Sequence, residues 1–484
     1  MQFIYEVAVG VALILTIFGV PALCIYAGYL IWKRKQPRTI GEELRSHFAG
    51  VPLERIAVSK RSFPGHVHAD LFRAVETALE ESRTHVFSGL EAAANSYTGG
   101  TDFNSLFQSG GLVGTQKMEA PQYTEIDVGE DKPLRVLSSG LWALSKGPVR
   151  FVVLFRTCET RRGTGACVVE VAAPDDEAGT SLVQEFFARL ESEVVRAASY
   201  RGKILSFERE SSYAGTASGM KVHRLKNVAR DEVILPKATL DLLERNVIRF
   251  VAQRQELGRR ALSRKKGLLF YGPPGTGKTH TIRWLVGTLE GHTALLIAAQ
   301  QMGALGEYLK VARLLQPSVV VIEDVDLIAL DRSLDDGRST QALLHELLNE
   351  MDGLRDDCDV TFILTTNRPQ DLEQALASRP GRIDQAIEFP LPDAEGREKL
   401  VRLYGRGCEL SDELVRAVVE RTEKVSASFI KELMRRAVQF RLERNGAEDL
   451  LLQDVDRALD EMLFSGGSLN LKLLGASGRI DAGE

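Results

Sequence analysis

The chain has 484 residues, a formal net charge of −5 and 44% hydrophobic residues. This length suits two or three domains with separate cores, and the nearly balanced charge gives no reason to expect a nucleic-acid partner. The five cysteines have neither a C-x-x-C pair nor the spacing of metal ligands, so we expect free thiols in a reducing compartment.

Residues 1–35 predict an N-terminal transmembrane anchor. Residues 7–32 carry no charged side chain and are long enough to cross a bilayer with some tilt. The basic cluster at 33–35 follows at once, so the positive-inside rule places the rest of the chain in the cytoplasm. A cleaved signal peptide would need a basic leader, and a lipoprotein signal at Cys24 would need a small residue where Leu23 stands. A single-pass membrane protein fits best.

Residues 36–60 have the composition of a juxtamembrane linker, and residues 61–210 predict a small α+β domain whose role the sequence does not reveal. Runs rich in β-forming residues cover 134–144, 149–156 and 166–173, with turn signals between them. We therefore expect an antiparallel sheet in this domain. Residues 96–122, rich in Gly, Ser, Thr and Asn, predict a long loop.

A helix is expected to begin near Leu182, because Ser181 and Gln184 have capping-box spacing and Gly202 stands where a C-terminal cap would end it. His66 and His68 could be read as metal ligands. No third ligand stands near them, so we expect two surface histidines and no metal there.

Residues 230–395 predict an α/β nucleotide-binding core with a parallel sheet. Residues 220–236 are expected to be extended. They lead to an amphipathic helix at 237–257 that carries its apolar residues on one side. Those residues are Leu240, Leu243, Val247, Ile248 and Val251.

The most informative stretch of the core satisfies G-x-x-x-x-G-K-[ST] in full. Its residues are Gly272, Pro273, Pro274, Gly275, Thr276, Gly277, Lys278 and Thr279. Glycines let the backbone amides curl around an anion, and the following helix adds its positive end. Lys278 can reach the β- and γ-phosphates of ATP, and the Thr279 hydroxyl can hold Mg²⁺. An apolar strand before the loop and a helical pattern after it strengthen this interpretation.

The run of β-branched residues at 319–322 predicts a buried parallel strand, which ends in Glu323 and Asp324. Carboxylates at such a strand end lie where α/β sheets bind ligands. One of them would hold Mg²⁺ and the other would polarise the attacking water.

A third strand at 360–366 ends in Asn367, whose amide could orient that water. Farther on, Arg379 and Arg382 flank a Pro-Gly turn. Their guanidinium groups suit bidentate contact with a phosphate held by a neighbouring subunit.

Together these motifs resemble the AAA family of ring ATPases over residues 230–465. The resemblance implies that 272–279 is Walker A, that 319–324 is Walker B and that Asn367 is sensor 1. It places Arg379 and Arg382 at the two arginine-finger positions. It also implies a helical lid at 396–465, a short tail at 466–484, and a homo-oligomeric ring, often of six subunits, with fingers acting in trans.

The Walker B strand ends in Glu-Asp instead of the usual Asp-Glu, as in the membrane-anchored Bcs1-like branch. By position, the resemblance gives Glu323 the Mg²⁺ role, together with Thr279, and gives Asp324 the water-activating role. An Asp base is one methylene shorter, so slow hydrolysis is one expectation.

The core is similar to that of FtsH-like enzymes without their protease domain. Residues 345–349 come near the zinc-protease motif H-E-x-x-H, but Asn349 replaces the second histidine, so we expect no zinc protease. Residues 298–308 lack the aromatic–hydrophobic–Gly signature of loops that thread unfolded protein, and Met302 with Gly303 is only a weak substitute. The sequence thus predicts a membrane-anchored ATPase that remodels or moves a protein, with an ATP-gated scaffold of little activity as the alternative.

Overall fold

The protein is described here by a computed structural model. It describes residues 39–48, 51–90, 102–107, 118–158, 165–196, 199–207, 220–327, 347–353, 358–370, 372, 382–444 and 449–465. The predicted membrane anchor, the C-terminal tail and most of the predicted loop at 96–122 lie outside these residues. Within the described ranges, every helix is too short or too polar to cross a bilayer.

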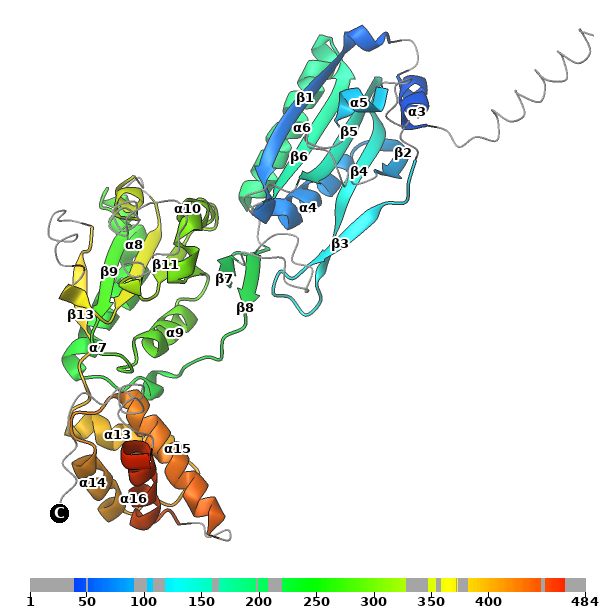
Figure 1. The fold of residues 1–484 in the computed structure, drawn as a ribbon. Coiled ribbons are helices and arrows are strands. Elements are labelled where there is room, and N and C mark those ends of the chain that lie inside the picture. The colour runs from blue at the N-terminus through cyan, green and yellow to red at the C-terminus, as the bar shows by residue number, and fades with distance from the viewer. Residues whose placement is uncertain are drawn as a thin grey trace, which may run out of the picture. The chain divides into compact units, whose positions relative to one another are not determined.

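The described chain forms two compact units (Figure 1). The first has a six-stranded antiparallel sheet in the order β1-β6-β5-β4-β2, with β3 also paired to β4. Its strands are β1 (Ile56–Pro64), β2 (Arg83–Gly89), β3 (Gln122–Ile126), β4 (Leu134–Lys146), β5 (Val149–Cys158) and β6 (Ala166–Pro174). The predicted β-rich runs correspond to β4, β5 and β6, which are antiparallel neighbours as expected.

Helices cover both faces of this sheet (Figure 1). The helices α4 (His68–Leu79) and α6 (Glu177–Arg196) pack together on one face. The short helices α3 (Ile40–His47) and α5 (Phe103–Phe107) share a core with the other face. Because both faces are covered, the central strands are buried along most of their length.

The predicted start of the helix in this unit is wrong. The helix α6 begins at Glu177, and the Asp176 carboxylate caps it by accepting a hydrogen bond of 2.7 Å from Gly179 N. Ser181 therefore lies inside the first turns. Gly202 does not cap the helix, because α6 ends at Arg196.

The prediction of two surface histidines is also wrong. His66 and His68 are only 5% and 2% exposed. His68 Nε2 lies 2.9 Å from Leu137 O, and its ring stacks on Phe155. A buried imidazole with a carbonyl partner is a structural group, and burial lowers the pKa of His68.

The second unit contains a seven-stranded sheet in the order β13-β9-β12-β11-β10-β7-β8. The strands are β7 (Ile204–Phe207), β8 (Met220–His223), β9 (Lys266–Tyr271), β10 (Thr293–Ile297), β11 (Ser318–Ile322), β12 (Val360–Thr366) and β13 (Gln385–Glu388). All neighbours are parallel except β7 and β8. The expected parallel α/β core is therefore confirmed.

The predicted domain limits at residues 210 and 230 need correction. The strand β7 pairs in parallel with β10, and β8 pairs with β7, so the described residues 199–207 and 220–228 belong to the nucleotide-binding unit. Leu205 in β7 is fully buried. The short apolar run at 204–207 carries no sequence signal that tells which sheet it joins, because pairing partners far apart in sequence decide that.

The predicted helix at 237–257 corresponds to α7 (Lys237–Leu243), a π-helical turn at Glu244–Arg249 and α8 (Phe250–Arg259). Leu243 and Val247 lie in the main hydrophobic core as the periodicity predicts. The helices α9 (Lys278–Thr288) and α10 (Leu305–Leu314) follow β9 and β10.

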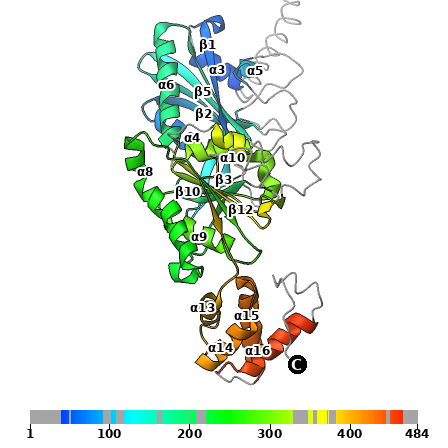
Figure 2. The ribbon, with the colours of Figure 1, turned by 90° about the vertical axis from the view of Figure 1, so that its left-hand side faces the viewer.

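The C-terminal helices form a bundle with a core of its own (Figure 2). They are α13 (Ala394–Tyr404), α14 (Asp412–Arg421), α15 (Ala427–Glu443) and α16 (Leu452–Asp460). Side chains of Asp393, Ser411 and Ser426 cap the first three of these helices. This bundle occupies the segment that the resemblance assigns to the lid.

Candidate nucleotide site

The loop at residues 272–279 joins the end of β9 to the start of α9, and Lys278 is the first residue of that helix. Gly275 and Gly277 have φ angles of +76° and +97°. These left-handed conformations turn the backbone around a concave surface, and only glycine adopts them without strain. The local geometry is that of an anion cradle at a helix N-terminus.

Lys278 lies inside this loop. Its ammonium donates to Gly272 O at 2.8 Å and to Pro273 O at 3.0 Å, and the residue is 7% exposed. Burial lowers the pKa of Lys278 to about 8, while Asp324 and Asp326 act in the opposite direction. A cation held at the mouth of an amide cradle is placed to meet a phosphate.

The ends of β11 and β12 meet beside the loop. Asn367 Nδ2 donates to Asp324 Oδ1 at 3.0 Å, and Asp324 N donates to Thr365 Oγ1 at 2.9 Å. The buried Asp326 carboxylate accepts from Thr366 Oγ1 at 2.9 Å. The fold therefore brings together Asp324 and Asn367, which the sequence separates by more than forty positions.

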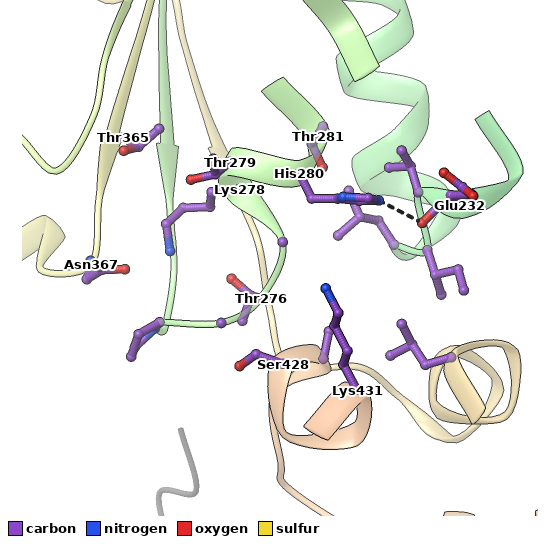
Figure 3. Close-up of a pocket in the computed structure, with 18 of the residues that line it drawn as sticks. Glu232, Thr276, Lys278, Thr279, His280, Thr281, Thr365, Asn367, Ser428 and Lys431 are labelled. Carbon is purple, nitrogen blue, oxygen red and sulfur yellow. Dashed lines mark hydrogen bonds between the residues drawn. The ribbon is translucent and has the colours of Figure 1, made fainter. Parts of the chain in front are cut away.

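A cavity of about 370 Å³ lies over the loop (Figure 3). It is lined by Glu232, Val233, Ile234, Leu235, the loop residues from Pro274 to Thr279, His280, Thr281, Asp324, Thr365, Asn367, Leu400, Tyr404, Ala427, Ser428 and Lys431. Glu323 is half-buried and does not line it. Its predicted Mg²⁺ role stays a prediction, as do the roles of Thr279, Asp324 and Asn367.

The lid contributes side chains that sequence reasoning missed. Ser428 N donates to Gly275 O at 3.0 Å, so α15 touches the phosphate loop directly. Lys431, one turn later, points toward the cavity beside Thr276 (Figure 3). The sequence holds no signal for these contacts, because helical periodicity indicates a helix and does not tell what its first turn faces.

The arginine predictions have a divided outcome. Arg379 lies outside the described residues. Arg382 forms an ion pair with Asp352, and its carbonyl packs against Gly267 at the start of β9. The phosphate loop follows the other end of β9, and six residues of strand span about 20 Å. Arg382 therefore cannot reach the phosphate loop of its own chain.

The segment after β10 is anchored. Residues Ala299–Ala304 form a short 3-10 helix in which Met302 is 2% exposed. Gln301 Nε2 donates to Phe207 O at 2.6 Å, and Tyr308 Oη accepts from Phe207 N at 2.7 Å. A buried Met302 does not present its side chain to a passing polypeptide.

Comparison with known proteins identifies the domain. A model of the ATPase family associated with various cellular activities (AAA) matches residues 268–391, which run from β9 through the acidic strand end to β13. This chain carries a AAA ATPase domain.

Several curated relatives share this AAA domain. A proteasome-activating nucleotidase of Methanosphaerula palustris is 31% identical over 229 residues, which cover 45% of this chain and 55% of that protein. A 26S proteasome regulatory subunit 6B homolog of Encephalitozoon cuniculi is 37% identical over 188 residues, which cover 36% of this chain and 47% of that protein. The ATP-dependent zinc metalloprotease FtsH of Thermus thermophilus is 30% identical over 231 residues, which cover 45% of this chain and 36% of that protein. The chain thus spans about half the length of these three relatives, or less.

Proposed function

We propose that this protein binds Mg²⁺-ATP and hydrolyses it in a homo-oligomeric ring, which acts on a protein substrate near a membrane. The observation that carries the proposal is the convergence of Lys278, Asp324 and Asn367 on one cavity over a left-handed glycine loop. The named activities of the relatives, proteasome activation and ATP-dependent proteolysis, agree with a protein substrate.

The residues present fit a triphosphate with a hard cation. Gly275 and Gly277 leave the loop amides open, and Lys278 supplies a positive charge beside the carbonyls of Gly272 and Pro273. The Thr279 hydroxyl and the carboxylates after β11 are oxygen donors of the kind that Mg²⁺ prefers. Mg²⁺ would neutralise developing phosphate charge when bound.

The residues of this chain then have distinct tasks. Asp324 would accept a proton from the attacking water. Asn367, which is hydrogen-bonded to Asp324 Oδ1, would hold the carboxylate and the water in position for the attack. The apolar wall at Val233–Leu235 with Leu400 and Tyr404 suits a purine base. Arg379 and Arg382 would stabilise transition-state charge on the nucleotide of a neighbouring subunit.

Turnover by purified residues 36–484 tests the enzyme, because α3 (Ile40–His47) and β1 (Ile56–Pro64) are part of the first unit. We expect ATP hydrolysis that Lys278→Ala abolishes through loss of binding. Asp324→Asn should retain ATP binding and lower kcat by about a hundredfold or more, the usual contribution of a general base. Wild-type turnover no faster than that of Lys278→Ala would reject hydrolysis and favour the alternative, an ATP-gated scaffold.

The membrane part of the proposal rests on the uncharged run at 7–32 and the basic cluster after it. The full chain should stay in the membrane fraction after alkaline carbonate washing, and a chain lacking residues 1–35 should not. Equal extraction of both chains would contradict the anchor.

Two activities of related enzymes are not part of the proposal. Asn349 stands in place of a second histidine ligand, which argues against zinc proteolysis. The buried Met302 argues against threading of a polypeptide by residues 298–308.

A further inference from the structure

The backbone of Asp324 has an unusual conformation. Its φ angle is +50°, in the left-handed region that residues other than glycine seldom occupy. The two other described non-glycine residues with positive φ, Ala261 and Lys424, follow the ends of α8 and α14. Left-handed residues are common at helix ends. Asp324 instead follows the central strand β11 and lines the nucleotide cavity.

Thr365 holds this conformation. Its hydroxyl accepts the hydrogen bond from Asp324 N at 2.9 Å, and its carbonyl accepts from Val325 N at 2.9 Å. Thr365 is 2% exposed, so water cannot readily replace the hydroxyl. Thr365 of β12 therefore binds the amides of Asp324 and Val325, which lie on either side of the Asp324 α-carbon just after β11.

The held backbone aims the carboxylate. From the left-handed position Asp324 Oδ1 reaches Asn367 Nδ2 at 3.0 Å. Glu323, the preceding residue, does not line the cavity. If Asp324 relaxed to an ordinary strand conformation, its side chain would change direction, because the φ angle sets where Cβ points.

We propose that Thr365 is a positioning residue for ATP hydrolysis, whose hydroxyl holds Asp324 in the left-handed conformation that presents its carboxylate to Asn367 and the nucleotide. The inference rests on the proposed function, because it takes Asp324 as the group that activates water. It also gives a physical reason for the order Glu323–Asp324, since Asp tolerates the left-handed region better than Glu does.

The test compares two substitutions at Thr365. Thr365→Val keeps the shape of the side chain and removes the acceptor, and Thr365→Ser keeps the hydroxyl. We expect Thr365→Val to lower kcat about tenfold or more while the KM for ATP stays within about twofold, and Thr365→Ser to stay near wild type. Thr361→Val, a buried position on the same strand, is the matched control. If the valine variant does not fold, Thr365→Ala serves with the same readouts.

A second comparison separates positioning from general damage. On an Asp324→Asn background, Thr365→Val should lower the residual rate no further, because the group that it positions is already gone. An unchanged kcat in Thr365→Val, a loss in Thr365→Ser as large as in Thr365→Val, or a full additional loss on the Asp324→Asn background would each overturn the inference.

The failure of the proposed function has a different signature, namely a wild-type protein that does not hydrolyse ATP. The positioning role is then decided by a crystal structure of Thr365→Val. A changed backbone at residue 324, with the bond to Asn367 lost, supports the role of Thr365. An unchanged left-handed Asp324 that still bonds to Asn367 overturns it.

Discussion

Lys278 combines a binding role with an unusual titration. Burial lowers its pKa to about 8 from an ordinary value of 10.5. Between these two values the folded chain holds fewer protons on this group than the unfolded chain does. The stability that this group contributes therefore rises with pH across that window and is lost as pH falls through about 8.

ATP binding should depend on pH in the opposite sense. Phosphate is attracted to the ammonium form, so the affinity for ATP should fall about tenfold per pH unit above about pH 8. Binding titrations of the full chain at several pH values between about 7 and about 9.5 measure this. Lys278→Arg, which stays charged throughout, is the control and should show a flat profile. A wild-type affinity that is equally flat would contradict the lowered pKa.

At the scale of elements, the contact between the phosphate loop and α15 decides how the lid sits on the nucleotide. A Cβ at Gly275 would collide with Ser428 Oγ and approach Ser426 Oγ at 2.9 Å. Gly275→Ala therefore combines left-handed strain with a clash against the lid. Gly291, with a φ angle of +73° and open space around it, allows the strain to be measured alone.

We expect Gly275→Ala to weaken ATP binding at least about tenfold, because the lid residues around Ser428 can no longer close on the loop. Gly291→Ala should leave ATP binding unchanged and cost only the strain, about 1 kcal/mol of unfolding free energy. Calorimetric binding and thermal unfolding of both variants provide the comparison. Equal ATP affinity in the two variants would show that the lid contact does not matter for binding.

At the scale of the whole molecule, the position of Arg382 bears on assembly. Its backbone lies beside the start of β9, and the strand that separates this point from the phosphate loop is about 20 Å long. In the described residues, Arg382 forms an ion pair with Asp352. A guanidinium in this position can assist hydrolysis only at the nucleotide of another subunit. To do so, Arg382 would first have to break its ion pair with Asp352 of its own chain.

Mixing experiments test this arrangement. Arg382→Ala and Asp324→Asn subunits should each be inactive alone, and mixed rings should recover part of the activity, because some interfaces then pair an intact Asp324 with an intact Arg382. Arg379→Ala should behave in the same way. Mixed rings that demonstrably form and yet show no recovery would contradict a shared site.

The sequence by itself determined the parallel core and the phosphate loop, because their signals are local, whereas the lid was expected only from the family resemblance. A glycine pattern requires particular φ angles, a β-branched run requires burial, and helical periodicity requires an apolar face. They also indicated that Asp324 and Asn367 lie beside the loop that contains Lys278, and the structure places them there.

Only the tertiary structure decided which distant groups meet. It placed β7 and β8 in the nucleotide-binding sheet, buried His66 and His68, and set Thr365 against the amide of Asp324. It also brought Ser428 and Lys431 of the lid to the phosphate loop. The physical reason is that strand pairing and side-chain burial depend on contacts with residues far away in the sequence. The local sequence around a residue does not specify these contacts.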